Sequence, residues 1–275
     1  MIAALTEPLT YEFMRRALIA SALAGAVTAL IGTYVVLRGM AFLGGALSHA
    51  VLPGAAIAYL LGYNTSIGAF IAGLVASAGI GLVSSHRHLK EDTAIGILMS
   101  GMFALGIAII STIQSYSVDL SSFLFGNVLA VTTGDIKAML AVCVVVVLAL
   151  KLLGRQWTVF SFDPTYAAAL GLPTMALHYG LLVLLSVVIV ASMKVVGVVL
   201  VLAMLVTPPA TARLLSNRLH TMMWLSALLG SLAAVSGLYI SYYLNVAAGA
   251  CMVLVSVAVF FAVFLFNLSR KRSAD

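Results

Sequence analysis

Residues 135–153 read DIKAMLAVCVVVVLALKLL, and this stretch decides the fold. Every residue between Lys137 and Lys151 is apolar. A helix needs roughly 20 predominantly apolar residues to cross the hydrocarbon core of a bilayer. The stretch lacks the alternation of a barrel strand, and backbone groups in hydrocarbon must pair within their own segment. The pattern therefore predicts a membrane-spanning helix.

Eight further apolar runs of similar length accompany this one. They cover residues 17–37, 41–62, 66–85, 93–113, 175–192, 195–215, 222–243 and 246–268. Many contain glycine and alanine, small residues that allow helices to approach closely in lipid. We expect an all-α, polytopic membrane helix bundle of about nine helices (eight to ten), forming a single transmembrane domain over residues 1–275.

Composition supports a membrane protein. Of the 275 residues, 63% are hydrophobic and 8% are charged, whereas an average soluble domain is about 25% charged. The mean hydropathy is +1.19. These values exclude soluble enzymes, nucleic-acid-binding domains and disordered proteins. Cys143 and Cys251 lie within apolar runs, which argues against a disulfide framework. Glu7 and Glu12 precede the first run, so we expect no cleaved secretory signal there.

The cationic residues predict an orientation, because cytoplasmic loops of membrane proteins carry an excess of Lys and Arg. With nine spans and the N-terminus outside, ten cations lie inside and four lie outside. The four outside are Arg15, Arg16, Lys137 and Lys194. Arg15 and Arg16 weaken the count, and residues 8–16 could form a short interfacial helix.

The sequence lacks several motifs that energise transport or carry out catalysis in other proteins. It has no GxxxxGK[ST] phosphate-binding loop, no HExxH and no CxxC. No span carries an arginine ladder or the several carboxylates of many proton-coupled carriers. The pattern indicates a membrane transport protein whose energy is supplied by another protein.

Residues 38–54, RGMAFLGGALSHAVLPG, resemble the second-helix signature of the metal-ion ABC importer permeases for zinc, manganese and iron. Four further segments resemble motifs of the same family in the same order. They are EDTAIGIL at 91–98, DLSSFLFGNVL at 119–129, FDPTYAAALGLP at 162–173 and VVGVVLVLAMLVTPPATARLL at 195–215.

The resemblance implies a non-enzymatic transport subunit in the cell membrane, which moves a divalent Zn, Mn or Fe ion into the cytoplasm. It implies a homodimer, cytoplasmic ATP-binding subunits that hydrolyse ATP, and an extracytoplasmic metal-binding protein. The chain itself would hold no cofactor beyond the transported metal. Import of a metal chelate or another small solute stays open, and an intramembrane enzyme or a secondary carrier is a weaker alternative.

His49 is the main candidate metal contact, because an ionisable residue inside a span is by default a functional hypothesis. The alternative is a histidine that hydrogen-bonds across helices. The family often has an acid four residues before this histidine, on the same helix face, but this chain has Gly45 there. The resemblance therefore implies a metal site that is weakened, moved, or completed by water.

For each remaining candidate residue, a purely structural role is the alternative to a role in transport. Asp119, the only acid of its loop, attracts a cation or caps a short helix. His178 lines the pathway or bonds a neighbouring helix. His86 and His88 look like a small metal tract, although a solvated basic loop explains them better. Lys194 is expected to snorkel to the interface.

Residues 154–174 form the longest predicted cytoplasmic connection. Asp163 followed by Pro164 is a helix-start signal, and Gly171 is expected to end the short helix. By resemblance this segment is the coupling loop, which would contact the ATPase through Ala167, Ala168, Ala169 and Gly171. Later, Pro208 and Pro209 are expected to break or end their helix.

Overall fold

The computed structural model describes residues 7–84, 91–112 and 128–272. In these ranges the chain is helical and has no strands. The helices are α2 (Glu12–Leu37), α3 (Ala41–Ala50), α4 (Leu52–Leu60), α5 (Thr65–Ser84), α6 (Glu91–Ser111), α8 (Thr133–Phe162), α9 (Pro164–Ala169), α10 (Thr174–Val196), α11 (Val198–Leu215), α12 (Leu219–Leu244) and α13 (Ala248–Arg272), with a short 3-10 turn at Val128–Ala130.

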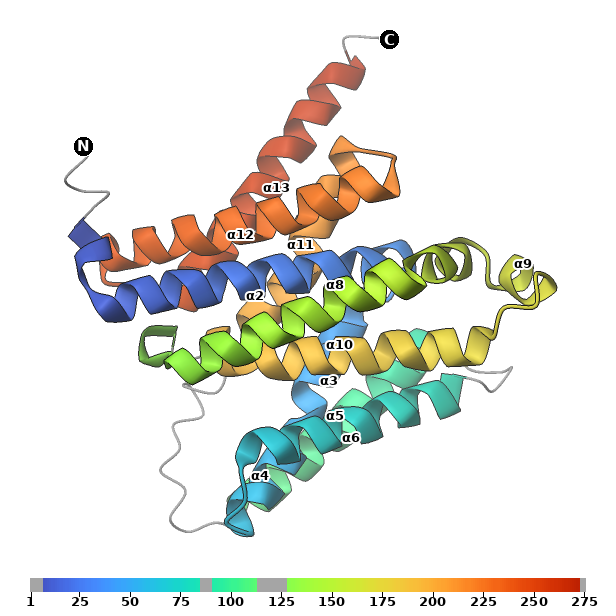
Figure 1. The fold of residues 1–275 in the computed structure, drawn as a ribbon, viewed down its shortest axis with the longest axis horizontal. Helices are drawn as coiled ribbons and strands as arrows, with labels where there is room; N and C mark the ends of the chain where they lie inside the picture. Colours follow the sequence, from blue (N-terminus) through green and yellow to red (C-terminus); the bar gives the residue numbers. More distant parts are fainter. Residues whose placement is uncertain (1–6, 85–90, 113–127, 273–275) are drawn as a thin grey trace.

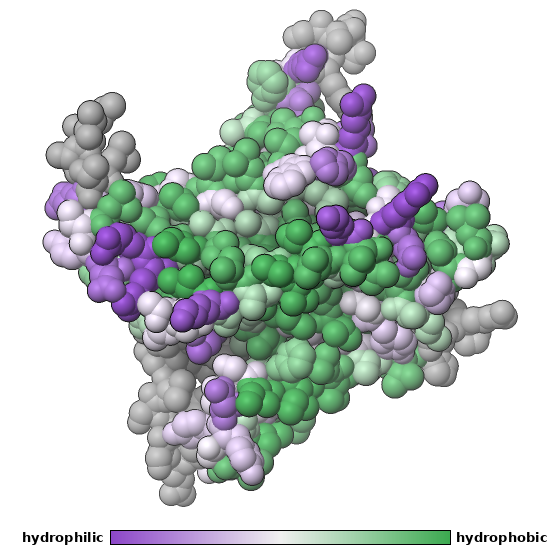
Figure 2. Space-filling view, in the orientation of Figure 1, coloured by the Kyte–Doolittle hydropathy of each residue, from purple (hydrophilic) through white to green (hydrophobic). Residues whose placement is uncertain are grey.

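Nine helical segments of the described chain are long and apolar enough to cross a membrane, and α3 and α4 together make one of them. This confirms the predicted helix bundle and its nine spans. On the face drawn in Figure 2, apolar residues cover the middle of the molecule, and hydrophilic residues gather toward its ends. A surface of this kind fits a protein embedded in a bilayer.

We call the end at which α2 stops and α9 lies the cytoplasmic end, as the charge count predicts. In Figure 1, α9 lies at the far right, beyond the ends of the neighbouring spans. At the opposite end, two of the four predicted outer cations are neutralised: Arg16 pairs with Glu12, and Lys194 lies 2.7 Å from Asp135. The Lys194 side chain is 60% exposed at this end, where the sequence placed it at the interface, and it forms its ion pair there.

Helix α2 lies at the centre of one layer, between α8 and α12 (Figure 1). It is among the most deeply buried spans, together with α3–α4 and α10. At its crossing with α12, a Cβ added to Gly25 would stand 2.5 Å from the carbonyl oxygen of Gly230. Gly54 and Gly68 make a still closer crossing between α4 and α5, where an added Cβ at Gly54 would overlap the Gly68 carbonyl oxygen. These contacts confirm that the small residues serve helix packing.

Helix α8 is longer than its apolar run. The sequence predicted an end near residue 153, but the helix continues to Phe162. Its 30 residues span about 45 Å at 1.5 Å each, which exceeds a hydrocarbon core of about 30 Å. The extra turns carry Trp157, which is buried and donates from Nε1 to the Leu177 carbonyl of α10 at 2.9 Å. A mixed polar sequence thus stays helical because it packs on α10.

The expected break at Pro208 and Pro209 does not occur, because α11 continues through both prolines to Leu215. Pro209 removes the donor that would bond the Leu205 carbonyl. That carbonyl faces Gly32 of α2, where an added Cβ would overlap its oxygen. The neighbouring helix therefore accommodates the altered segment, as is common for prolines inside membrane spans.

Candidate functional site

His49 lies near the middle of the Ala41–Leu60 span, at the point where α3 gives way to α4. The junction residue is Val51, and Pro53 stands in the first turn of α4. Proline has no N–H, so the His49 carbonyl lacks the helical donor that residue 53 would otherwise supply. This position therefore presents an imidazole nitrogen and a carbonyl oxygen as potential ligands at mid-span.

The His49 side chain lies at the surface of the single chain. From Leu43 to Ala50, all residues except His49 are buried, and His49 is partly exposed. Its ring meets Phe103 of α6 edge to face, with centroids 4.9 Å apart, and Phe103 is itself 37% exposed. An imidazole facing hydrocarbon is unfavourable. The position thus calls for a second protein surface or an aqueous path beside it.

Gly45 lies one turn before His49 and close to α11. A Cβ built at Gly45 would be 3.6 Å and 3.7 Å from the two methyl groups of Leu202, which is ordinary contact. The backbone thus leaves room to begin a side chain at the position where the resembled family often has an acid.

Ser48 is a candidate that the sequence analysis missed. Its side chain is fully buried, and its hydroxyl has no hydrogen-bond partner in the structure. A serine inside a helix commonly bonds the carbonyl four residues earlier, so an unpartnered hydroxyl calls for an explanation. The only signal in the sequence is its place beside His49.

No other titratable ligands gather around His49 in the described ranges, where no group of three or more His, Cys, Asp or Glu side chains could hold a metal ion. Asp119, His86 and His88 lie outside the described residues. His49 and its own carbonyl are therefore the potential ligands that the described part of the chain places at mid-span.

Helix α9 has the caps that the sequence predicted. Asp163 Oδ1 accepts from the backbone N–H groups of Thr165 and Tyr166, both at 2.9 Å. Pro164 occupies the first turn, where a missing N–H costs nothing. Gly171 adopts φ +74° just beyond the helix, and its N–H donates to the Ala168 carbonyl at 3.0 Å. A left-handed residue of this kind is a common helix terminator.

The exposed face of α9 differs from the expected one. Ala167 is fully buried, so only Ala168, Ala169 and Gly171 of the four small residues are exposed. Large apolar side chains around them are exposed as well: Phe162 at 66%, Tyr166 at 55%, Leu170 at 54% and Met175 at 61%. An apolar patch of this kind on a projecting segment is typical of a protein interaction site.

A cluster at the cytoplasmic end joins α2, α8 and α10. Arg38, at the turn between α2 and α3, donates from Nη1 to His178 Nδ1 at 3.1 Å. Its guanidinium also lies over the Phe160 ring, 4.6 Å from the centroid. His178 thus forms a hydrogen bond to the end of a neighbouring helix, which was the structural alternative given for it above. The cluster connects the base of α9 to the turn that precedes α3.

Comparison with known proteins places this geometry among transporters. The sequence pattern of the "ABC 3 transport family" matches residues 10–267. The "Manganese transport system membrane protein MntC" of Listeria monocytogenes is 48% identical over 256 residues, covering 93% of this chain and 91% of the relative. The "Probable iron transport system membrane protein" of Haemophilus influenzae is 38% identical over 268 residues, covering 98% of both. Among solved structures, "PsaBC from Streptococcus pneumoniae in complex with Fab" matches with a TM-score of 0.86 and 42% identity, covering 96% of this chain and 95% of that one.

Proposed function

This chain belongs to the ABC 3 transport family, and we propose that it is the membrane permease of an ATP-driven importer for Mn²⁺. It is a multi-pass membrane protein and a transport subunit. Manganese is the metal named for the 48% identical Listeria protein. The observation that carries the proposal is the position of His49, a partly exposed histidine at a helix discontinuity in the middle of a span.

The ligand chemistry around His49 suits a weak transit site. Mn²⁺ leans on oxygen ligands, and the His49 carbonyl is an oxygen that Pro53 has freed from its helical donor. The imidazole adds one nitrogen. Desolvating a divalent ion costs more than these two groups offset, so water or another chain must complete the shell. A conduit needs such weak binding, because the ion must also leave.

The permease acts as a homodimer in this proposal, with the two copies of His49 facing one pathway. The partly exposed position of His49 beside Phe103 supports this arrangement, because a second copy would cover an imidazole that otherwise meets lipid. Two imidazoles and two carbonyls would then converge on the ion. Asp119, near the predicted outer mouth, would attract cations toward it.

ATP is bound and hydrolysed by separate cytoplasmic subunits, because this chain has no phosphate-binding loop. Those subunits dock on α9, through the exposed Ala168, Ala169 and Gly171 and the apolar side chains around them. The Arg38–Phe160–His178 cluster passes their motion to the turn before α3, and so to His49. An extracytoplasmic binding protein delivers the metal at the opposite end.

Iron is the second candidate cargo, because the Haemophilus relative that matches 98% of this chain is named for iron. Imidazole also suits iron. The two metals are distinguished by competition during uptake.

Uptake of radioactive manganese by cells tests the proposal. Cells that lack this gene should regain ATP-dependent uptake when the intact gene is supplied, and lose it again when the partner ATPase is inactivated. Excess unlabelled Mn²⁺ should compete better than Fe²⁺. Uptake that is independent of the ATPase would contradict the proposal, and stronger competition by Fe²⁺ would assign the permease to iron.

A further inference from the structure

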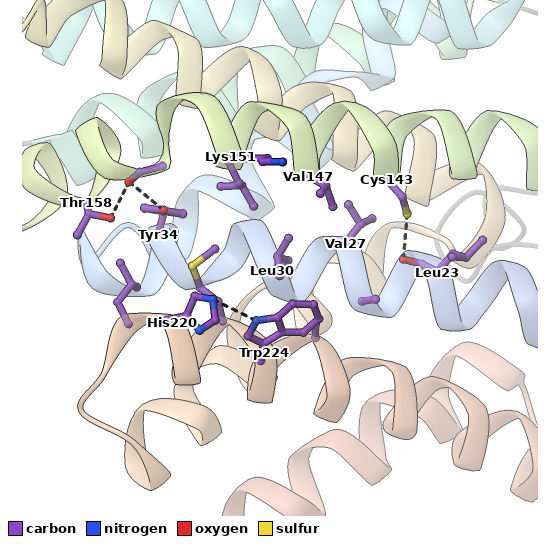
Figure 3. Close-up of a pocket in the computed structure, with 16 residues that line it drawn as sticks. Leu23, Val27, Leu30, Tyr34, Cys143, Val147, Lys151, Thr158, His220 and Trp224 are labelled. Atoms are coloured by element: carbon purple, nitrogen blue, oxygen red, sulfur yellow. Dashed lines mark hydrogen bonds between the residues drawn. The ribbon is translucent and has the colours of Figure 1, made fainter.

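A long apolar groove runs along the outside of the bundle between three helices. Its cavity measures about 860 Å³. Figure 3 shows α2 as its floor, with Val27 and Leu30, and α8 and α12 as its two walls. This groove is remote from His49, since neither α3 nor α6 contributes to its lining. The proposed transport function therefore leaves it unexplained.

The groove is about one lipid leaflet deep. Along its floor it runs from Leu23 to Tyr34, which is about 16 Å at 1.5 Å per residue. Half of a hydrocarbon core is about 15 Å. Tyr34 lies in the last turn of α2, and His220 in the first turn of α12. The groove thus begins at the predicted cytoplasmic interface and ends near mid-membrane.

Two hydrogen-bond donors line this apolar groove on opposite walls, and Figure 3 places Lys151 level with Leu30. Lys151 of α8 lines it and has no ion-pair partner among the described residues. On the opposite wall, His220 Nε2 accepts from Trp224 Nε1 at 3.4 Å, so the imidazole Nδ1–H is left to donate. Trp224 is 66% exposed, as is typical of tryptophans at a membrane interface.

We propose that this groove binds an anionic phospholipid of the inner leaflet. An acyl chain lies along Leu30, Val27 and Leu23, and the phosphate sits between Lys151 and His220. Basic pockets between helices on the cytoplasmic side suit lipid headgroups of this charge. A second copy of the chain is a poorer occupant, because docking groove to groove would bring two unpaired Lys151 ammonium groups together.

Quenching of Trp224 fluorescence by brominated lipids tests the proposal on the full chain. The protein is reconstituted in phosphatidylcholine vesicles that contain increasing fractions of phosphatidylglycerol, with bromine on the acyl chains of one lipid or the other. A Trp224→Phe variant supplies the background from Trp157. Brominated phosphatidylglycerol should quench Trp224 at lower mole fractions than brominated phosphatidylcholine.

Variants separate the headgroup contact from the acyl contact. Lys151→Gln should lower the preference for phosphatidylglycerol about five-fold, as expected for one lysine near an anionic lipid. Lys137→Gln is the matched control, because Lys137 lies on the same helix outside the groove, and it should leave the preference unchanged. Ala26→Phe would fill the floor and should reduce quenching by both lipids.

Equal quenching by the two lipids would overturn the proposal. So would a preference that survives replacement of both Lys151 and His220 by glutamine. Cys143 lines the far end of the groove, so disulfide cross-linking of two copies through Cys143 would assign the groove to a second chain and also overturn it.

Discussion

At the scale of single residues, His49 acquires its chemistry from its neighbours along the chain. Pro53 removes the helical donor to its carbonyl, and the exposed side of α3 turns its ring toward Phe103. Gly45 withholds the carboxylate that would make a strong site. In the proposed function, these two atoms would bind a divalent ion weakly and would depend on a further surface.

Gly45→Asp should tighten metal binding. The new Cβ meets only the Leu202 methyl groups at ordinary contact distances, and the carboxylate would share a helix face with His49. We expect roughly ten-fold tighter binding or more, since even outer-shell groups change metal affinity by 10–100-fold. Isothermal titration of the purified protein with Mn²⁺ measures the change, and transport should slow because release is harder. Gly45→Asn is the uncharged control. If Gly45→Asp binds Mn²⁺ no more tightly than the wild type, this position does not lie on the metal path.

At the scale of helices, α2 depends on small residues for its contacts. Gly32→Ala should destabilise the protein by about 1–3 kcal/mol, because its Cβ would press on the Leu205 carbonyl oxygen. Gly96→Ala is the control, since nothing lies within 4 Å of its Cβ, and alanine is a better helix former than glycine. Thermal unfolding in detergent compares the two. Equal stability of the two variants would show that α2 and α11 do not pack as described.

Helix α9 should couple ATP hydrolysis to transport only while its end keeps its shape. Gly171 has φ +74° and open space around it, so a substitution there acts on the backbone alone. Gly171→Val should uncouple hydrolysis from uptake, because a β-branched residue rarely adopts this conformation. Asparagine adopts a positive φ more readily, so the Gly171→Asn variant should keep ATP hydrolysis coupled to uptake. The measurement is the ratio of transported metal to hydrolysed ATP in reconstituted vesicles. A Gly171→Val variant that keeps the wild-type ratio would show that this segment has no part in coupling.

The sequence predicted the spans and the caps of α9 because both rest on local signals. Apolar runs mark membrane helices, and Asp163, Pro164 and Gly171 mark the ends of a short one. It missed the full length of α8, the continuity of α11 through Pro208, and the burial of Ala167. Each of these depends on packing against another helix. The partnerless hydroxyl of Ser48 and the exposure of His49 depend on the whole bundle, so no local pattern announces them.

At the scale of the whole molecule, the charge count predicts which end faces the cytoplasm. Tyr63 lies in the turn between α4 and α5, and Asn217 lies between α11 and α12. In a chain with Cys143 and Cys251 replaced, Tyr63→Cys should react with an impermeant maleimide added to intact cells. Asn217→Cys should react only after the cells are opened. The reverse pattern would invert the orientation.

The described part of the bundle holds no group of three or more His, Cys, Asp or Glu side chains that could bind a metal ion. In the proposed assembly, two copies bring two His49 side chains together, and α9 receives the motion of the ATPase. In the same proposal, the apolar surface would hold the pair in the bilayer, and the groove between α2, α8 and α12 would bind a lipid on the outside.

The most direct test is ATP-driven uptake of radioactive manganese by vesicles that contain this permease and its ATPase, with wild-type or His49→Leu protein. Leucine fills the space but offers no ring ligand, so uptake should fall at least about ten-fold while ATPase assembly is retained. Phe103→Leu, which keeps the imidazole and removes the ring beside it, should still transport. Normal uptake by a fully assembled His49→Leu permease would contradict this mechanism and show that the metal crosses the membrane elsewhere.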